Sequence, residues 1–116
     1  MTEPTSLLFI CSHNKWRSPT AEALFDQHPH YVARSAGTEA GARVRVTAGL
    51  LGWADIIFVM ERRHADRLQA KFAEELRGKK LIVLRIPDKY QRNDPRLIAV
   101  LQEQLPKYLS LFSAAN

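Results

Sequence analysis

Three short, continuous apolar runs limit what this chain can fold into. They span residues 7–10, 56–60 and 81–84, and each is the length of a strand rather than of a helix. Runs of this kind are typical of parallel strands, which are buried on both faces because helices cover both sides of the sheet. A fourth run at residues 31–35 is less apolar, so we expect it at an edge of the sheet.

Between these runs the apolar residues repeat at helical spacing. The chain alternates strand and helix four times, which predicts an α/β fold: a doubly wound, four-stranded parallel sheet with helices on both faces. Its 116 residues are expected to form a single domain, residues 1–116. Gly78 is expected to stop one helix and Pro106 to kink another. The helical repeats are Ala21, Leu24 and Phe25; Ala65, Leu68, Phe72 and Leu76; and Leu97, Leu101, Leu105, Tyr108, Leu109 and Phe112.

Composition narrows the possible functions. One cysteine excludes a disulfide within the chain and argues against a cysteine metal cluster. No apolar run approaches a membrane span and residues 1–6 lack the features of a signal peptide, so a cytoplasmic protein is expected. The net charge of +5 favours anionic partners, but the basic residues are scattered, so nucleic acid is a possible partner and not the favoured one.

Cys11 directly follows the first apolar run, where the carboxyl end of a buried strand is expected. Ligands of doubly wound sheets bind beyond these strand ends. Ser18 and Pro19 are typical of a helix start, with Ser18 as the N-cap and Pro19 as the first helical residue. The loop of residues 11–17 therefore joins a strand end to a helix start, and its backbone N–H groups can converge on one anion.

The spacing within this loop suits phosphoryl transfer. Five residues between Cys11 and Arg17 let the loop curl around a tetrahedral anion, with the sulfur at the bottom and the guanidinium gripping two oxygens. The same positive field favours the thiolate, to which Ser18 is a candidate hydrogen-bond donor. Further substrate-binding candidates in the loop are Ser12, His13, Asn14, Lys15 and Trp16.

The segment from Cys11 to Arg17, followed by Ser18-Pro19 and Ala21-Glu22-Ala23, resembles the low-molecular-weight protein tyrosine phosphatases. Residues 34–38, 54–61 and 88–90 resemble the family's second strand, third strand and acid loop. The resemblance implies the phosphotyrosine phosphatase I-like fold, phosphotyrosine on protein as the substrate class, and no metal or organic cofactor. The chain departs from the family in having His13 for a usual glycine, Trp16 for a frequent second cysteine, and a shorter stretch between residues 38 and 47.

Two aspartates are candidates for the general acid that protonates the leaving group. Asp94 precedes Pro95 at a helix start, where an aspartate is a common N-cap. Alignment with the family instead sets Asp88 on its acid, although Lys89 follows where the family has proline. The same alignment puts Tyr90 where an aromatic residue of the cleft is expected. The alternative for Tyr90 is that it shields the last helix. Asp88 is therefore favoured.

The predicted activity is phosphomonoester hydrolysis through a phospho-cysteine, with Cys11, Arg17 and Asp88 as the catalytic residues. Two alternatives remain at this point. One is arsenate reduction, which with a single cysteine requires an external thiol; the other is a module that binds RNA, phosphate or a phosphoprotein with little turnover. His28, His30 and His64 lack metal-ligand spacing and are assigned to the surface or to packing. Oligomeric state is left open.

Overall fold

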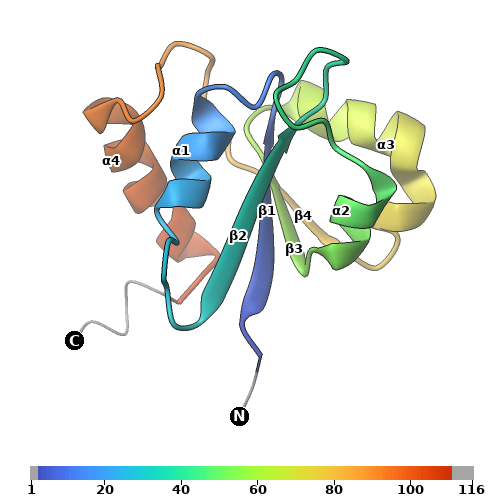
Figure 1. Cartoon of the computed structure of the whole chain (residues 1–116), viewed down its shortest axis with the longest axis horizontal. Coiled ribbons are helices and arrows are strands. Elements are labelled where there is room, and N and C mark those ends of the chain that lie inside the picture. The colour runs from blue at the N-terminus through green and yellow to red at the C-terminus, as the bar shows by residue number, and fades with distance from the viewer. Residues whose placement is uncertain (1–2, 111–116) are drawn as a thin grey trace.

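A parallel sheet lies at the centre of the protein (Figure 1). The computed structural model describes residues 3–110, and within them four strands pair in the order β2-β1-β3-β4. All four predicted runs are strands, and the run at residues 31–35 lies at an edge, as predicted. The strands are β1 (Thr5–Cys11), β2 (Tyr31–Gly37), β3 (Ile56–Val59) and β4 (Lys80–Val83).

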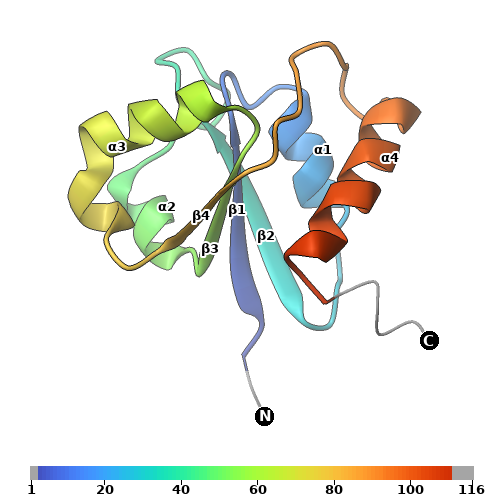
Figure 2. The same ribbon diagram turned by 180° about the vertical axis from the view of Figure 1, so that it is seen from behind.

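Helices cover both faces of this sheet, which confirms the doubly wound fold (Figures 1 and 2). On one face lie α1 (Arg17–Ala23) and α4 (Pro95–Gln104). On the other lie α2 (Ala48–Trp53) and α3 (Arg62–Leu76). In the part of the chain that the structure describes, no helix has the length and apolar character needed to cross a membrane.

Successive side chains of β1 point to opposite faces of the sheet, so the core has two layers. Leu7, Phe9 and Cys11 face α1 and α4, whereas Leu8 and Ile10 face α2 and α3. On the first face the Phe9 ring stacks on Phe25, in the turn after α1, at 5.7 Å and on Phe58 of β3 at 5.1 Å between centroids. Both faces of β1 are therefore sealed from water, which explains why the strand is a continuous apolar run.

Helix α1 begins earlier than its sequence suggests. Its first residue is Arg17, so Pro19 is the third helical residue and Ser18 is not the N-cap. The Ser18 hydroxyl contacts the Cys11 sulfur and the Asn14 amide instead of a free backbone N–H. The prediction of Ser18 as a cap was wrong because the loop itself uses that hydroxyl.

The other helix ends follow ordinary signals. Thr47 caps α2, whose position the apolar repeat did not reveal, by accepting a hydrogen bond from the Leu50 N–H at 3.1 Å. Gly78, at φ +77°, follows the end of α3. Helix α4 passes into a 3-10 turn at Leu105–Lys107, so the chain departs from regular α-helix at Pro106, as predicted. Phe112 of the predicted apolar repeat lies outside the described residues.

The end of β2 lies against the loop that follows β1. Gly37 pairs with Cys11, and a Cβ placed on Gly37 would lie 2.6 Å from the Ser12 carbonyl oxygen and 2.9 Å from the Asn14 nitrogen. These neighbours are backbone atoms, so they cannot be moved by rotating a side chain. Only glycine lets the strand and the loop approach this closely.

We expect Gly37→Ala to lower the free energy of unfolding by about 1–3 kcal/mol, as overpacking of a rigid site does. Urea unfolding at neutral pH measures the change. Gly52→Ala is the matched control, since Gly52 lies in α2 and a Cβ placed on it would have nothing within 4 Å. That control should be neutral or stabilise the protein by up to about 1 kcal/mol. Equal effects of the two substitutions would contradict the close approach at Gly37.

Candidate active site

A cavity of about 390 Å³ opens at the carboxyl end of β1. This is the point where the sheet continues to β2 on one side and to β3 on the other, the expected position for a ligand in a doubly wound fold. The cavity brings together the loop of residues 11–17, the segment after β2 and the segment between β4 and α4. Its lining residues are Cys11, Ser12, His13, Lys15, Trp16, Arg17, Gly41, Arg43 and Asp88.

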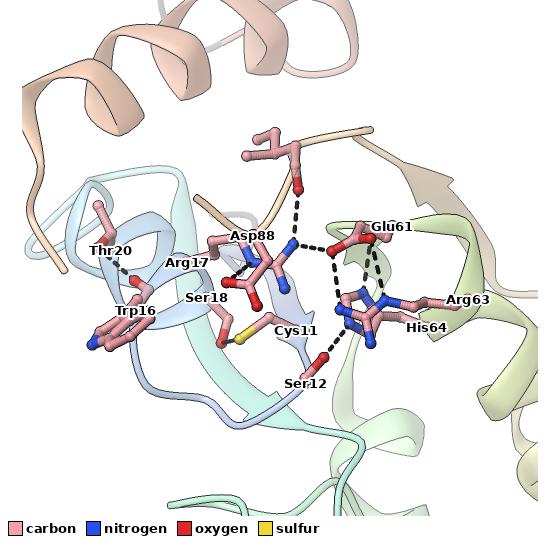
Figure 3. Close-up of polar contacts among 11 residues, drawn as sticks. Cys11, Ser12, Trp16, Arg17, Ser18, Thr20, Glu61, Arg63, His64 and Asp88 are labelled. Atoms are coloured by element: carbon pink, nitrogen blue, oxygen red, sulfur yellow. Dashed lines mark hydrogen bonds and ion pairs between the residues drawn. The ribbon is translucent and has the colours of Figure 1, made fainter. Parts of the chain in front are cut away.

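Cys11 lies at the bottom of the loop, and its side chain is almost fully buried. Its sulfur is 3.0 Å from the Ser18 hydroxyl oxygen (Figure 3). The Asn14 Nδ2 group donates to the same oxygen at 2.8 Å. Since Ser18 accepts from Asn14, its own hydrogen is left to donate, and its two acceptors are the sulfur at 3.0 Å and the more distant Ala36 carbonyl at 3.5 Å.

Asn14 supports the loop from within. It adopts a left-handed backbone conformation, φ +55°, which asparagine tolerates better than most residues. Its Nδ2 group also donates to Ser35 Oγ at 2.9 Å, and Ser35 donates to the Glu22 carboxylate. Asn14 is fully buried and, like Ser18, does not line the cavity, so these two predicted substrate-binding residues lie behind the loop rather than at the ligand position.

Arg17 reaches the cavity from the first position of α1, and its side chain is only 2% exposed. Its Nη1 atom donates to the Glu61 carboxylate at 2.5 Å and to the Ile86 carbonyl at 2.8 Å. Its Nε atom lies 3.8 Å from Asp88 Oδ1. Within residues 3–110 no hydrogen-bond partner is assigned to Nη2, and the adjacent Nε faces only the Asp88 carboxylate (Figure 3).

Glu61, just before α3, holds this arginine in place. Its carboxylate also accepts hydrogen bonds from Arg63, at 3.2 Å to each oxygen. The bonds from Arg63 and Arg17 lower the pKa of Glu61 from 4.5 to about 2, against the opposing effect of burial. The carboxylate is therefore charged throughout the neutral range. Sequence reasoning did not single out Glu61, because nothing in its local pattern indicates a partner 44 residues away.

The two candidate acids lie in different surroundings. Asp88 lines the cavity and is 49% exposed, so both water and a ligand can reach it. Asp94 caps α4 by accepting from the Arg96 N–H at 2.9 Å, and the Arg96 guanidinium pairs with it and lowers its pKa. Asp94 is not among the residues that line the cavity.

The segment carrying Asp88 is tied to the loop through Thr20. The Asn93 N–H donates to Thr20 Oγ1 at 2.9 Å, and Thr20 Oγ1 donates to the Trp16 carbonyl at 2.6 Å. Tyr90 lies elsewhere: it is buried among the core residues that include Leu97 and Leu101 of α4. It does not line the cavity, so of its two predicted positions the one that shields the last helix matches the structure.

The mouth of the cavity is basic and partly aromatic. His13, Lys15 and Trp16 are exposed there, as expected for loop residues in contact with a substrate. The short segment after β2 adds Arg43, which the sequence did not single out. Its backbone N–H donates to the His13 carbonyl at 3.0 Å and its Nε to the Asn14 carbonyl at 3.1 Å, so the guanidinium is held over the loop.

Of the two assignments left open for His64, surface or packing, the structure supports packing, and it adds a polar contact that the sequence did not indicate. His64 is fully buried in the first turn of α3, and its Nε2 atom lies 2.9 Å from Ser12 Oγ (Figure 3). His28 instead contacts His30 and the rings of Phe25 and Tyr31. Among residues 3–110 no three His, Cys, Asp or Glu side chains gather as metal ligands.

Comparison with known proteins identifies relatives of this arrangement. No family model matches the sequence. The protein named low molecular weight protein-tyrosine-phosphatase Wzb, from Escherichia coli K12, is 29% identical over 125 aligned positions, which cover 82% of this chain and 84% of Wzb. The solved structure of the tyrosine phosphatase Wzb from Escherichia coli K30 in complex with phosphate is 26% identical, with a TM-score of 0.66 over 86% of this chain and 90% of that one.

Two further solved structures share the fold. A low molecular weight protein tyrosine phosphatase from Streptococcus pyogenes has a TM-score of 0.75 at 16% identity, covering 97% of this chain and 98% of that one. The YwlE arginine phosphatase from Geobacillus stearothermophilus has a TM-score of 0.67 at 22% identity, covering 87% and 86%.

The fold, the cavity with its cysteine and these relatives define the class of the protein: it is a cysteine-dependent phosphatase. The Wzb proteins are named as tyrosine phosphatases, which favours neither of the predicted alternatives, arsenate reduction or a binding module without turnover. These matches agree with the resemblance of the loop to the low-molecular-weight protein tyrosine phosphatases.

The ion pairs of Glu61 with Arg63 and Arg17 predict a pH-dependent stability. Because folding lowers the pKa of Glu61 from 4.5 to about 2, its contribution is complete above pH 4.5 and is lost as the pH falls toward 2. We expect Glu61→Gln to lower the free energy of unfolding at pH 7 by about 1–3 kcal/mol, since it weakens the hydrogen bonding of the buried Arg17 guanidinium. Urea unfolding at pH 7, 4 and 2.5 should show the difference from wild type shrinking with acidity. A difference that stays constant with pH would contradict the ion pairs.

Proposed function

We propose that this phosphatase hydrolyses phosphotyrosine on proteins through a phospho-cysteine intermediate on Cys11. The observation that carries the proposal is the convergence of a thiol, a guanidinium and an exposed carboxyl group on one cavity: Cys11, Arg17 and Asp88 all line it. These three groups supply a nucleophile, a clamp for the phosphoryl oxygens and a proton donor, which are the functions that the reaction requires.

In the first step the Cys11 thiolate attacks phosphorus in line with the leaving oxygen. The S–P bond forms as the ester P–O bond breaks, and Asp88 gives its proton to the departing phenolic oxygen. Arg17 holds two of the transferring oxygens with Nε and Nη2. Its other nitrogen is fixed by Glu61 and the Ile86 carbonyl, so the guanidinium needs little reorganisation when the anion arrives.

In the second step Asp88, now a carboxylate, takes a proton from water. The oxygen of that water attacks phosphorus, the S–P bond breaks, and inorganic phosphate leaves as the thiolate is restored. The Ser18 hydroxyl, 3.0 Å from the sulfur, stabilises the thiolate as the leaving group of this step. Asn14 supports the arrangement because it occupies the Ser18 oxygen as a donor and leaves the Ser18 hydrogen for the sulfur.

The substrate class rests on the relatives and on the cavity mouth. The Wzb proteins are named as tyrosine phosphatases, and Trp16 offers an exposed aromatic surface beside the loop on which a phenyl ring can stack. Lys15 and Arg43 add positive charge at the mouth. A phosphotyrosine flanked by acidic residues fits this mouth better than one in a basic sequence.

A reducing compartment is part of the proposal. The mechanism uses the thiolate of the chain's one cysteine, and Cys11 is a free thiol in the structure. The cytoplasm keeps such thiols reduced, which agrees with the predicted location.

Hydrolysis of p-nitrophenyl phosphate and of a phosphotyrosine peptide tests the mechanism. We expect the wild type to turn over both and Cys11→Ser to lose at least about 10³-fold, because it removes the nucleophile. Asp88→Asn should lower kcat on the peptide by about 10²-fold or more, and less on the nitrophenyl ester, whose better leaving group needs less protonation. Turnover that survives Cys11→Ser would refute the phospho-cysteine.

Asp94→Asn is the matched control for the acid. Asp94 caps α4 through the Arg96 N–H, so its substitution should cost stability and leave kcat within about threefold of wild type. A larger loss of kcat with Asp94→Asn than with Asp88→Asn would exchange the roles of the two residues. A wild type that binds phosphate but hydrolyses no phosphomonoester would overturn the proposed function.

A further inference from the structure

The mechanism above gives no role to His64, a buried titratable side chain. His64 is fully buried in the first turn of α3, yet its ring reaches a residue of the cavity, with Nε2 at 2.9 Å from Ser12 Oγ. Its other ring nitrogen, Nδ1, lies 3.1 Å from the backbone nitrogen of Glu61. Both nitrogens of the ring are therefore in hydrogen bonds, one to the start of the helix and one to the loop (Figure 3).

These two contacts determine which nitrogen carries the proton. A backbone N–H can only donate, so the Glu61 N–H requires Nδ1 to be an acceptor without a hydrogen. A neutral imidazole then carries its single hydrogen on Nε2. Nε2 consequently donates to Ser12 Oγ, and the serine oxygen is the acceptor of that bond.

The surroundings of the ring keep it neutral. Burial is the main cause that lowers the pKa of His64 from 6.5 to about 4, and the positive charges of Arg17 and Arg63 lower it further. Glu61 and Glu39 oppose this effect without cancelling it. Near neutral pH the imidazole thus remains a single donor aimed at Ser12.

The bond from His64 leaves the hydrogen of the Ser12 hydroxyl uncommitted. Ser12 lines the cavity beside Cys11 and Arg17, and in the described part of the chain His64 is the partner assigned to its hydroxyl oxygen. A serine that accepts from one neighbour turns its own hydrogen to another acceptor. The oxygens of an anion seated over the Cys11 sulfur would be such acceptors.

We propose that His64 is a positioning residue, which makes Ser12 a hydrogen-bond donor to the transferring phosphoryl group. The donor adds to Arg17 and to the backbone N–H groups of the loop, and it strengthens as negative charge builds on the equatorial oxygens. Without His64 the Ser12 hydroxyl is free to rotate, and its oxygen lone pairs would face the anion part of the time. This inference rests on the phosphatase function proposed above.

A double-mutant cycle on kcat/KM for p-nitrophenyl phosphate tests the link between the two residues. We expect Ser12→Ala to lower the value at least about tenfold, up to the hundredfold that loss of one such donor typically costs. His64→Leu should cause a similar loss in the wild type but less than about a twofold further loss in the Ser12→Ala background. Equal losses from His64→Leu in both backgrounds would overturn the proposal.

His64→Gln is the conservative variant. Glutamine at the third position of a helix accepts from the N-cap N–H, as His64 does here, and its amide also offers a donor for Ser12. It should restore kcat/KM to within about threefold of wild type. Thermal unfolding of each variant separates this effect from stability, because a purely structural role would make kcat/KM follow the melting temperature rather than the presence of a donor.

A measurement on the unmodified protein does not depend on any variant folding. Long-range ¹H–¹⁵N NMR of the histidine rings reports the tautomer directly. We expect His64 to be neutral and protonated at Nε2 at pH 6; an Nδ1-protonated ring or an imidazolium there would overturn the proposal.

The two proposals fail in different ways. Turnover that Cys11→Ser abolishes and Ser12→Ala leaves unchanged overturns the role of His64 and Ser12 alone. Absence of any turnover that depends on Cys11 overturns the proposed function, and the inference falls with it.

Discussion

The buried guanidinium of Arg17 is the group on which the geometry of the site depends. It is a charge taken almost completely out of water, and such a charge is tolerated only where its hydrogen bonds are supplied by the fold. The supply comes from Glu61 at the end of β3 and from the Ile86 carbonyl after β4. Arg17, at the start of α1, is thereby joined to the segments that follow β3 and β4. The loop between Cys11 and Arg17 is therefore fixed at both ends.

The start of α3 serves both ends of that loop. Glu61 holds Arg17 at one end, and His64, one turn further on, reaches Ser12 at the other. The same histidine accepts from the Glu61 N–H and so completes the helix start. Glu61 and His64 thus both stabilise the helix start and position groups of the site. A change at either residue is therefore expected to alter both the stability of the fold and the geometry of the site.

Much of the fold was accessible from the sequence because its signals are local. Continuous apolar runs identify parallel strands without knowledge of their partners, and the cysteine-to-arginine spacing after the first run identifies the loop. What the sequence did not reveal depends on contacts between distant segments. Ser18 has the pattern of a cap but bonds to Cys11 and Asn14. His64 and Arg43 carry no local signal, because their partners in the loop are brought near only by the folded sheet.

The tryptophan in the loop has a consequence for oxidation. The loop carries Trp16 rather than a second thiol, and Cys11 is the one cysteine of the chain. A sulfenic acid formed on Cys11 therefore finds no neighbouring thiol in the same molecule with which to condense. Its return to the reduced form depends on a reductant that diffuses into the cavity, so the recovery of the enzyme after an oxidative pulse would be set by the concentration of that reductant.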